Sequence, residues 1–431
     1  MTSGLHIDGE RLLRRLFELG AIGAIDGGGC ARLALTDLDR DGRDLVVTWM
    51  RDLGLDVTID ALGNVIGVWN VGSGAPVMCG SHIDTVATGG IYDGNLGVLA
   101  GLEVIETCQQ AGYTPPRPLA VGFFTDEEGA RFAPDMLGSL VYVGGMSAEE
   151  AHDVVGIDGA RVGDELARVG YLGASPCPGF VPHAFVELHI EQGPVLEEQG
   201  VRLGAVTGVQ GISWQQLTII GRSAHAGTTP MRLRRDPLAA AARIAAFVHD
   251  LAWELGEPQV GTVGKIDVHP NLVNVVASRV TMTVDLRNTD EAELQHAEER
   301  FAAFVAATAD EFHVDVTSRA LARFEPVTFD SRVVDLVEAI ATAQGNTVMR
   351  MPSGAGHDAQ MFAHICPAGM IFTPSVNGLS HNPAEFTEPA DLAAGAQVLL
   401  EVMLTLAATE FPPPPEAPVL PSSPASAEST V

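Results

Sequence analysis

Short apolar runs alternate with longer helical patterns along most of the chain, and this alternation constrains the fold more than any other feature. The run PVMCGSH precedes the helical stretch NLGVLAGLEVIETCQQAG, and the apolar run PLAVGFFT follows it. Buried strands that alternate with covering helices are typical of an α/β sheet. We therefore predict an α/β fold in which the loops at the strand ends carry the chemistry.

The sequence pattern changes twice, which indicates one domain inserted into another. Near Ile212 the strand SWQQLTIIG leads into the helical run DPLAAAARIAAFVHDLAWEL and further strands, and the first pattern resumes before RVVDLVEAIATAQG. At 431 residues the chain is long enough for two cores. We predict a discontinuous catalytic domain, an inserted α+β domain and a disordered tail rich in Pro, Ser and Ala, with these bounds: 1–211 and 325–410; 212–324; 411–431.

Composition disfavours several classes of partner. The 25 Lys and Arg against 55 Asp and Glu give a formal charge of −30, which repels nucleic acid and anionic membrane surfaces. The N-terminal stretch lacks the features of a signal peptide, and the longest apolar runs carry Glu or Arg, so we expect a cytoplasmic protein without a membrane span. Five scattered cysteines without CxxC spacing indicate reduced thiols.

Two polar residues follow the run PVMCGSH. His82 and Asp84 are two residues apart, so on extended backbone their side chains point to one side. A metal-binding imidazole must be held in one tautomer, and a carboxylate bonded to its other ring nitrogen achieves this. The pair suits a metal ligand with its orienting carboxylate, and an ordinary polar loop after a strand is the alternative.

Carboxylates also occur before a predicted helix and at the end of a second predicted strand. Asp93 lies just before the helix that begins NLGVL, where an N-cap aspartate is also common. Glu127 and Glu128 end the strand PLAVGFFT, and neighbouring side chains on extended backbone diverge. One glutamate can therefore bind a cation while the other serves as a general base, with a solvated acidic turn as the alternative.

Two histidines complete a candidate metal site. His189 alternates with Glu187 and Glu191 on one face of a strand, and His381 lies in the polar loop NGLSHNP. The candidate ligands contain imidazoles and carboxylates but no thiolate: His82, Asp93, Glu128, His189 and His381. This set suits Zn²⁺, with Mn²⁺, Co²⁺ and Ni²⁺ as alternatives. Five ligands exceed what one catalytic metal takes, so we expect two metals that share a carboxylate.

Together these segments resemble the zinc-dependent M20-type peptidases and amidases, in the branch of N-carbamoyl-L-amino-acid hydrolases, β-ureidopropionases and allantoate amidohydrolases. The resemblance spans nearly the whole chain before the tail, through GSHIDTVATGGIYDGNLGVLAGLEV, TDEEGARFAPDMLGS, ELHIEQGPVLE, GRSAHAGTTPM, VDLRNTD and GLSHNPAEFT. It implies a mixed-sheet dinuclear metallopeptidase-like catalytic domain, and it implies that the inserted domain is a lid through which two chains form a homodimer.

The resemblance also implies roles for residues of the metal centre. One metal would lie at His82, Asp93 and His189, and the second at Asp93, Glu128 and His381, with Asp93 as the bridge. Glu127 matches the general base, and Asp84 matches the carboxylate that orients His82. The residue before the paired glutamates, Asp126, departs from the asparagine expected in most relatives, which leaves the local charge beside Glu127 open.

Substrate contacts are implied in the same way. His225 matches a donor to the developing oxyanion, supplied either by the same chain or by the partner subunit, where it would stabilise charge that forms in the transition state. Gln192 and Asn274 match polar contacts, and Arg287 matches a carboxylate anchor because its planar fork donates two parallel hydrogen bonds. The segment of His357 and Asp358 also matches, without an assigned role beyond the pocket wall.

These observations predict a metal-dependent amidohydrolase that cleaves an N-carbamoyl-L-amino acid or a related ureido acid. Allantoate amidohydrolase is the first alternative, because allantoate also carries a carboxylate and ureido groups. An M20-type dipeptidase or aminoacylase is the second, and it requires a pocket for a larger acyl group. A catalytically silent binding module is disfavoured, since Glu127 would serve no purpose in binding alone.

Overall fold

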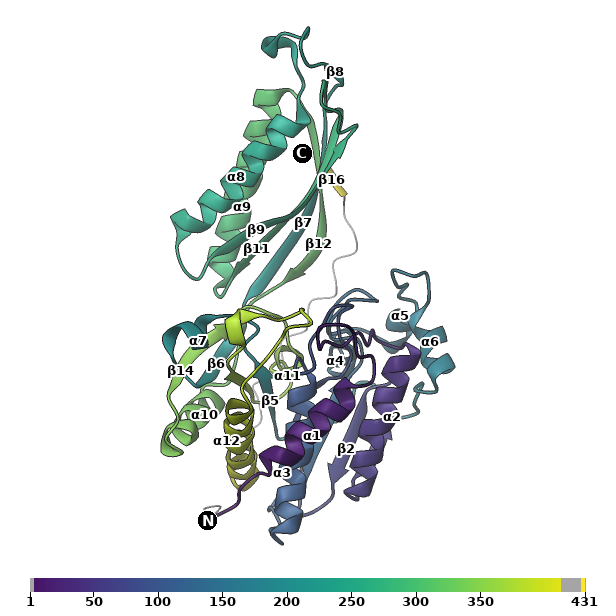
Figure 1. Ribbon diagram of the computed structural model, residues 1–431, viewed down its shortest axis with the longest axis vertical. Helices are drawn as coiled ribbons and strands as arrows, with labels where there is room; N and C mark the ends of the chain where they lie inside the picture. Colours follow the sequence, from purple (N-terminus) through teal and green to yellow (C-terminus); the bar gives the residue numbers. More distant parts are fainter. Residues whose placement is uncertain (1–3, 412–427, 431) are drawn as a thin grey trace. The chain divides into compact units, whose positions relative to one another are not determined.

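The structure is a computed structural model that describes residues 4–411 and 428–430. The described residues divide into two compact units (Figure 1), each described by itself: unit 1 contains residues 4–208 and 328–411, and unit 2 contains residues 209–327 and 428–430. Unit 1 has a mixed sheet with helices, which confirms the predicted α/β class. The lid and dimerisation roles of the inserted domain remain predictions.

The sheet of unit 1 places four parallel strands side by side. Strands follow the order β1-β2-β4-β3-β5-β15-β6-β13, with β14 paired to β6. Neighbours among β4, β3, β5 and β15 are parallel, whereas β2 and β6 join them antiparallel. The strands are β1 (Asp56–Ile59), β2 (Val65–Trp69), β3 (Val77–His82), β4 (Leu119–Phe124), β5 (Ala184–Ile190), β6 (Leu203–Val209), β13 (Val327–Thr328), β14 (Val348–Ser353) and β15 (Ala368–Thr373).

Helices cover both faces of this sheet. On one face Leu188 of β5 lies under α12, close to Gly395. On the other face Phe185 stacks on Phe362 of α11 with ring centroids 4.0 Å apart. The helices are α1 (Gly9–Gly20), α2 (Asp37–Asp52), α3 (Asn95–Gln110), α4 (Leu137–Tyr142), α5 (Ala148–His152), α6 (Val162–Val169), α7 (Val195–Gln199), α10 (Ser331–Ala343), α11 (Asp358–Phe362) and α12 (Pro389–Ala408), with a 3₁₀ turn η2 (Val376–Gly378).

Burial explains why these segments lack amphipathic alternation. Every residue of β3, β4, β5 and β15 is buried, so strands covered on both faces read as continuous apolar runs. Helix α12 is, within the described residues, the one helix long and apolar enough by composition to cross a membrane. Most of it is buried inside unit 1, and its packing against the sheet accounts for that apolar composition.

Unit 2 is an antiparallel sheet covered on one face by two long helices. The strand order is β16-β12-β7-β11-β9, and a two-stranded ribbon of β8 and β10 stands beside it. Helices α8 and α9 run side by side along the sheet (Figure 1) and bury a shared core with it. The elements are β7 (Gly211–Ile220), β8 (Ala224–His225), η1 (Met231–Leu233), α8 (Pro237–Leu255), β9 (Val260–His269), β10 (Val275–Val276), β11 (Arg279–Asn288), α9 (Glu291–Phe312), β12 (Asp315–Phe324) and β16 (Glu428–Thr430).

The two helices of unit 2 begin at residues that favour a helix N-terminus. The Asp236 side chain accepts hydrogen bonds from the first-turn amides of α8, and Pro237 occupies the first turn, where its missing N–H costs nothing. Asp290 caps α9 in the same way. Most of the tail predicted to be disordered lies outside the described residues. Residues Glu428–Thr430 differ from that prediction, because they pair as β16 with the edge strand β12.

Candidate metal centre

The candidate ligands gather where the parallel strands of unit 1 end. His82 is the last residue of β3, Glu127 and Glu128 follow β4, His189 lies near the end of β5, and His381 follows β15 and η2. Because these four strands are neighbours and point the same way, their carboxyl ends share one edge of the sheet. The fifth ligand, Asp93, comes from the connection between β3 and α3.

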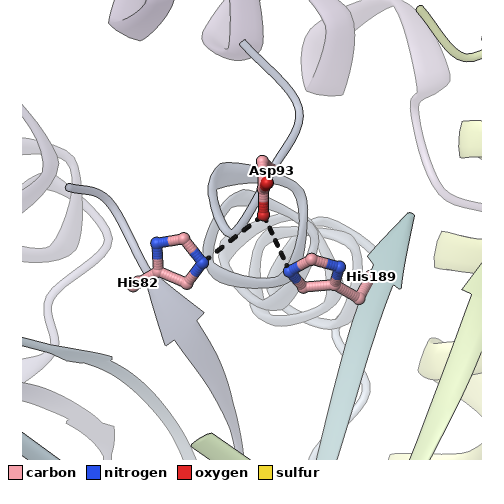
Figure 2. A group of neighbouring side chains, drawn as sticks. All are labelled: His82, Asp93 and His189. Atoms are coloured by element: carbon pink, nitrogen blue, oxygen red, sulfur yellow. Dashed lines mark ion pairs between the residues drawn. The ribbon is translucent and has the colours of Figure 1, made fainter. Parts of the chain in front are cut away.

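The Asp93 carboxylate lies between a pair of imidazoles on one side and a single imidazole on the other. Its Oδ1 atom is 3.5 Å from Nε2 of His82 and 3.2 Å from Nε2 of His189, and Figure 2 shows the two rings turned toward it. Its Oδ2 atom is 3.5 Å from Nε2 of His381. That histidine also lies 3.1 Å from Oε2 of Glu128. Two groups that could each hold a metal ion therefore share Asp93.

Adjacent glutamates face different histidines. Oε2 of Glu127 is 3.4 Å from Nε2 of His82, whereas Oε2 of Glu128 faces His381. Asp126 has φ +59°, so the chain turns sharply before the pair instead of continuing as a strand. The two glutamate side chains thus diverge as predicted, but through a left-handed turn. In the described part of the chain, the ion pairs of Asp93, Glu127 and Glu128 are all with histidines.

The shape of the site fits a bound cation. Gly94 has φ +66°, and a Cβ atom there would lie 2.4 Å from Nε2 of His82. That nitrogen must keep its lone pair open to a metal, and any other residue at position 94 would cover it. Asp93 also lies directly before the N-terminus of α3, where the helix dipole favours a negative charge.

The orienting contact of His82 differs from the prediction. Nδ1 of His82 lies 2.9 Å from the backbone carbonyl of Asp84, not from its carboxylate. The turn after β3 brings this carbonyl within reach, and a backbone carbonyl fixes a tautomer as well as a carboxylate does. The Asp84 carboxylate instead accepts a hydrogen bond from the Glu127 amide at 3.4 Å. His189 is held similarly, with Nδ1 2.9 Å from the carbonyl of Ile190.

Two further acidic residues, Glu385 and Glu187, position the ligands, and of these only Glu385 is new relative to the residues identified from the sequence. Glu385 accepts hydrogen bonds from the backbone amides of Tyr92 and Asp93, each at 3.2 Å, and from the Ser380 hydroxyl at 2.9 Å. Glu187, beneath His189, accepts from Ser81 at 2.6 Å. The SHNPAEF spacing could have signalled Glu385, because it lies four residues after His381 in the same loop.

Burial and these contacts shift the pKa values of the acidic and histidine side chains at the site. Burial opposes the charge on Asp93, yet hydrogen bonds with His189 and His82 hold the pKa of its carboxyl well below the usual range. Burial raises the pKa of Glu127 well above its usual range. The hydrogen bond with Glu128 raises the pKa of His381 to about 9. Burial also raises the pKa of Asp126 well above its usual range, and the nearby Asp84 carboxylate raises it further.

The remaining predicted residues of unit 1 lie against this centre. Gln192 donates from Nε2 to Oδ2 of Asp93 at 2.9 Å, and its backbone has φ +59°. The ring of His357 packs on that of His189 with centroids 4.5 Å apart, and its Nε2 bonds Ser353. His357 therefore packs against the candidate ligand His189. Asp358, the next residue, is fully buried at the start of α11.

Unit 2 carries the other three predicted substrate contacts. His225 and Asn274 lie together, because β8 pairs with β10 and the Ala226 amide bonds the Asn274 carbonyl. Arg287 lies near the far end of β11, at about 3.3 Å per residue roughly 25 Å along the strand from Arg279. The Arg287 guanidinium lies over the Trp214 ring and forms an ion pair with Asp285 at 3.0 Å.

Comparisons with known proteins identify the family of this chain. Residues 78–405 match the model of peptidase family M20/M25/M40. The chain belongs to this family. It is similar to an N-carbamoyl-L-amino acid amidohydrolase of Geobacillus stearothermophilus, with 42% identity over 94% of this chain and 100% of the relative. It is also similar to the allantoate amidohydrolase of Escherichia coli, with 36% identity over 90% and 96%.

A solved structure extends the agreement to the fold. A hydantoinase/carbamoylase family amidase from Burkholderia multivorans matches with a TM-score of 0.90 and 42% identity, over 94% of this chain and 100% of that one. The predicted family is therefore confirmed, as is the predicted class of enzyme, a hydrolase of C–N bonds other than peptide bonds. Members of the family depend on metals.

Proposed function

We propose that this protein hydrolyses N-carbamoyl-L-amino acids to the amino acid, carbon dioxide and ammonia, with two divalent cations in unit 1. The position of Asp93 between the pair His82 and His189 on one side and His381 on the other carries the proposal, because one carboxylate there can serve two cations. Similarity to the carbamoyl amino acid amidohydrolase of Geobacillus stearothermophilus supports the choice of substrate.

The proposed ligands divide into two sets with one shared member. His82, Asp93 and His189 would hold one cation, and Asp93, Glu128 and His381 the other. Zinc suits this donor set, and manganese, cobalt or nickel are compatible with it. When bound, the cations would acidify a shared water and polarise the ureido carbonyl.

The chain's own residues handle the proton and the substrate. Glu127, beside His82, takes the proton of the attacking water on its carboxylate and delivers it to the leaving nitrogen as the C–N bond breaks. Gln192 presents a polar group next to Asp93. We assign Arg287 as the anchor of the substrate carboxylate, and its stacking on Trp214 orients the guanidinium.

We further propose that the enzyme is a cytoplasmic homodimer joined through unit 2. His225 and Asn274 lie together at the ribbon of β8 and β10, which joins the Arg279 end of β11, and Arg287 lies roughly 25 Å along β11 from Arg279. One small substrate cannot contact both ends of the same unit. A second copy that supplies His225 and Asn274 would resolve this, and His225 would then donate to the oxyanion.

Ammonia release from the ureido substrates, together with release of free amino acids from dipeptides, tests the substrate assignment. Purified enzyme with measured metal content is assayed on a panel of N-carbamoyl-L-amino acids, allantoate and dipeptides. We expect the highest kcat/KM on a carbamoyl amino acid. Allantoate is the second candidate, because the chain is 36% identical to the Escherichia coli allantoate amidohydrolase. A preference for dipeptides would refute the proposed substrate class.

A further inference from the structure

Arg32 is a fully buried cation without a carboxylate partner among the described residues. Its Nε donates to the Ile83 carbonyl at 2.8 Å, and its Nη2 donates to Oδ1 of Asn95 at 3.0 Å. Its Nη1 reaches the carbonyls of Leu19 and Ile22 at 2.9 and 2.7 Å. Burial of a charge costs several kcal/mol before compensation. Four hydrogen bonds from a buried cation to neutral acceptors therefore call for an explanation.

Two of these acceptors belong to the loops that carry the candidate ligands. Ile83 separates His82 from Asp84, so its carbonyl lies in the turn that follows β3. Asn95 comes two residues after Asp93 and opens α3. The Asn95 side chain also donates to the Ile91 carbonyl at 3.1 Å, which closes the turn around Asp93. One planar guanidinium thus touches both turns.

The backbone of Arg32 reinforces the same connection. Its amide donates to the Thr85 hydroxyl at 2.7 Å, and its carbonyl accepts from the Thr85 amide at 3.0 Å. Arg32 is therefore joined to the segment after His82 at three points. The segment before it, at the end of α1, supplies only carbonyl acceptors.

We propose that Arg32 is a positioning residue for the metal centre, which fixes the His82 turn against the Asp93 turn. This inference rests on the proposed metal function of those two residues. Ligands that are already held apart at the correct distance lose less entropy when a cation binds, so the contacts behind the ligands set affinity. Arg32 acts through Ile83 and Asn95 and does not contact the substrate.

Arginine suits this role because its fork is rigid. Nε and Nη2 donate along one edge of the guanidinium, to Ile83 and Asn95 respectively. A lysine ammonium is a point charge on a flexible stem and cannot reproduce two fixed donors on one edge. A purely structural alternative exists, since Arg32 also satisfies the last carbonyls of α1. That alternative predicts lost stability with unchanged metal affinity.

Titration of the metal-free protein with Co²⁺ separates the two roles. Affinity and the visible absorption of bound Co²⁺ are measured for the wild type, Arg32→Met and Arg32→Lys, together with the thermal midpoint. Arg11→Met is the matched control, because it breaks an ion pair with the buried Glu103 on α3 without touching either turn. Asn95→Ala removes one acceptor while Arg32 stays in place, which covers the case in which the Arg32 variants fail to fold.

We expect both Arg32 variants and Asn95→Ala to bind Co²⁺ roughly 10- to 100-fold more weakly, with a changed absorption spectrum. Arg11→Met should lose thermal stability and keep wild-type affinity. Wild-type affinity in Arg32→Lys and Asn95→Ala would overturn the positioning role. Failure of the wild type itself to bind Co²⁺ would instead overturn the metal centre, and with it this inference.

Discussion

Oδ1 of Asp93 lies 3.2 Å from Nε2 of His189, while the other oxygen of Asp93 faces the opposite group of ligands. Both candidate cation sites therefore depend on one side chain. Loss of a ligand that belongs to one site alone would leave the second set of donors intact. Substitution of Asp93 should consequently remove more metal ions than substitution of a ligand that belongs to one site alone.

Asp93→Ala should remove both cations and reduce ammonia release to background. The expected result follows because each proposed set loses its shared carboxylate. Metal content per chain, measured by mass spectrometry on purified protein, checks it. Glu191→Gln serves as the control, since this buried carboxylate bonds the amides of Val195 and Leu196 at the start of α7. Two retained metals in Asp93→Ala would contradict the bridge.

Glu127→Gln should keep both cations and lose most of the activity. The amide preserves the size of the side chain but cannot take a proton from water. General base catalysis contributes about 10²- to 10⁴-fold, so kcat should fall by a factor in that range. Metal content and kcat are measured on the same sample. Wild-type kcat in this variant would show that another group accepts the proton.

Much of the site follows from the sequence because it obeys a rule of parallel sheets. His82 and Glu128 each stand where an apolar run stops, His189 lies at the end of another, and runs buried on both faces are easy to recognise. Parallel neighbours then bring those ends together without further information. Asp93 and His381 lie in loops, where no strand end marks them. Their assignment as ligands rests on the family resemblance and on the presence of the other candidate ligands in the sequence.

The parts that escaped prediction depend on backbone conformation. The carbonyl of Asp84 orients His82, and side-chain patterns carry no signal for a backbone acceptor. Asp126, Gln192 and His381 have positive φ, which non-glycine residues adopt at a cost of about 1 kcal/mol or more and which no local propensity suggests. The ion pair of Arg287 with Asp285 places the proposed substrate anchor against a carboxylate of its own strand, and the sequence does not indicate this contact.

Gly94→Ala should weaken cation binding through a steric effect. The new Cβ atom would lie 2.4 Å from Nε2 of His82 and force that ring away from its position. Gly112→Ala is the matched control, because Gly112 also has positive φ, +64°, but nothing lies within 4 Å of its Cβ position. Both variants should lose about 1 kcal/mol or more of stability from the positive φ, and Gly94→Ala should lose more because of the clash. Only Gly94→Ala should lose metal affinity in a zinc titration, and equal affinities would contradict the clash.

Removal of metal should lower the thermal midpoint of the protein. A ligand that binds only the folded state at 100 times its Kd stabilises that state by about 2.7 kcal/mol. Calorimetry with and without a chelator measures the change, and added Zn²⁺ or Mn²⁺ should restore the midpoint. Asp93→Ala provides the comparison, since its midpoint should not respond to the chelator. A wild-type midpoint that is equally unresponsive would speak against bound metal.

Two inactive variants should restore activity when their chains are combined. His225→Ala and Glu127→Gln remove groups from different units of the chain, and in the proposed homodimer one active site draws Glu127 from one copy and His225 from the other. A mixed dimer then contains one site with both residues intact. Co-expression of equal amounts should give about a quarter of wild-type activity, because half of the dimers are mixed and each has one working site of two. Differently tagged chains allow the mixed dimer to be purified and assayed alone. If His225 acted within its own chain, every site in the mixed dimer would lack one of the two residues and the purified mixture would stay inactive.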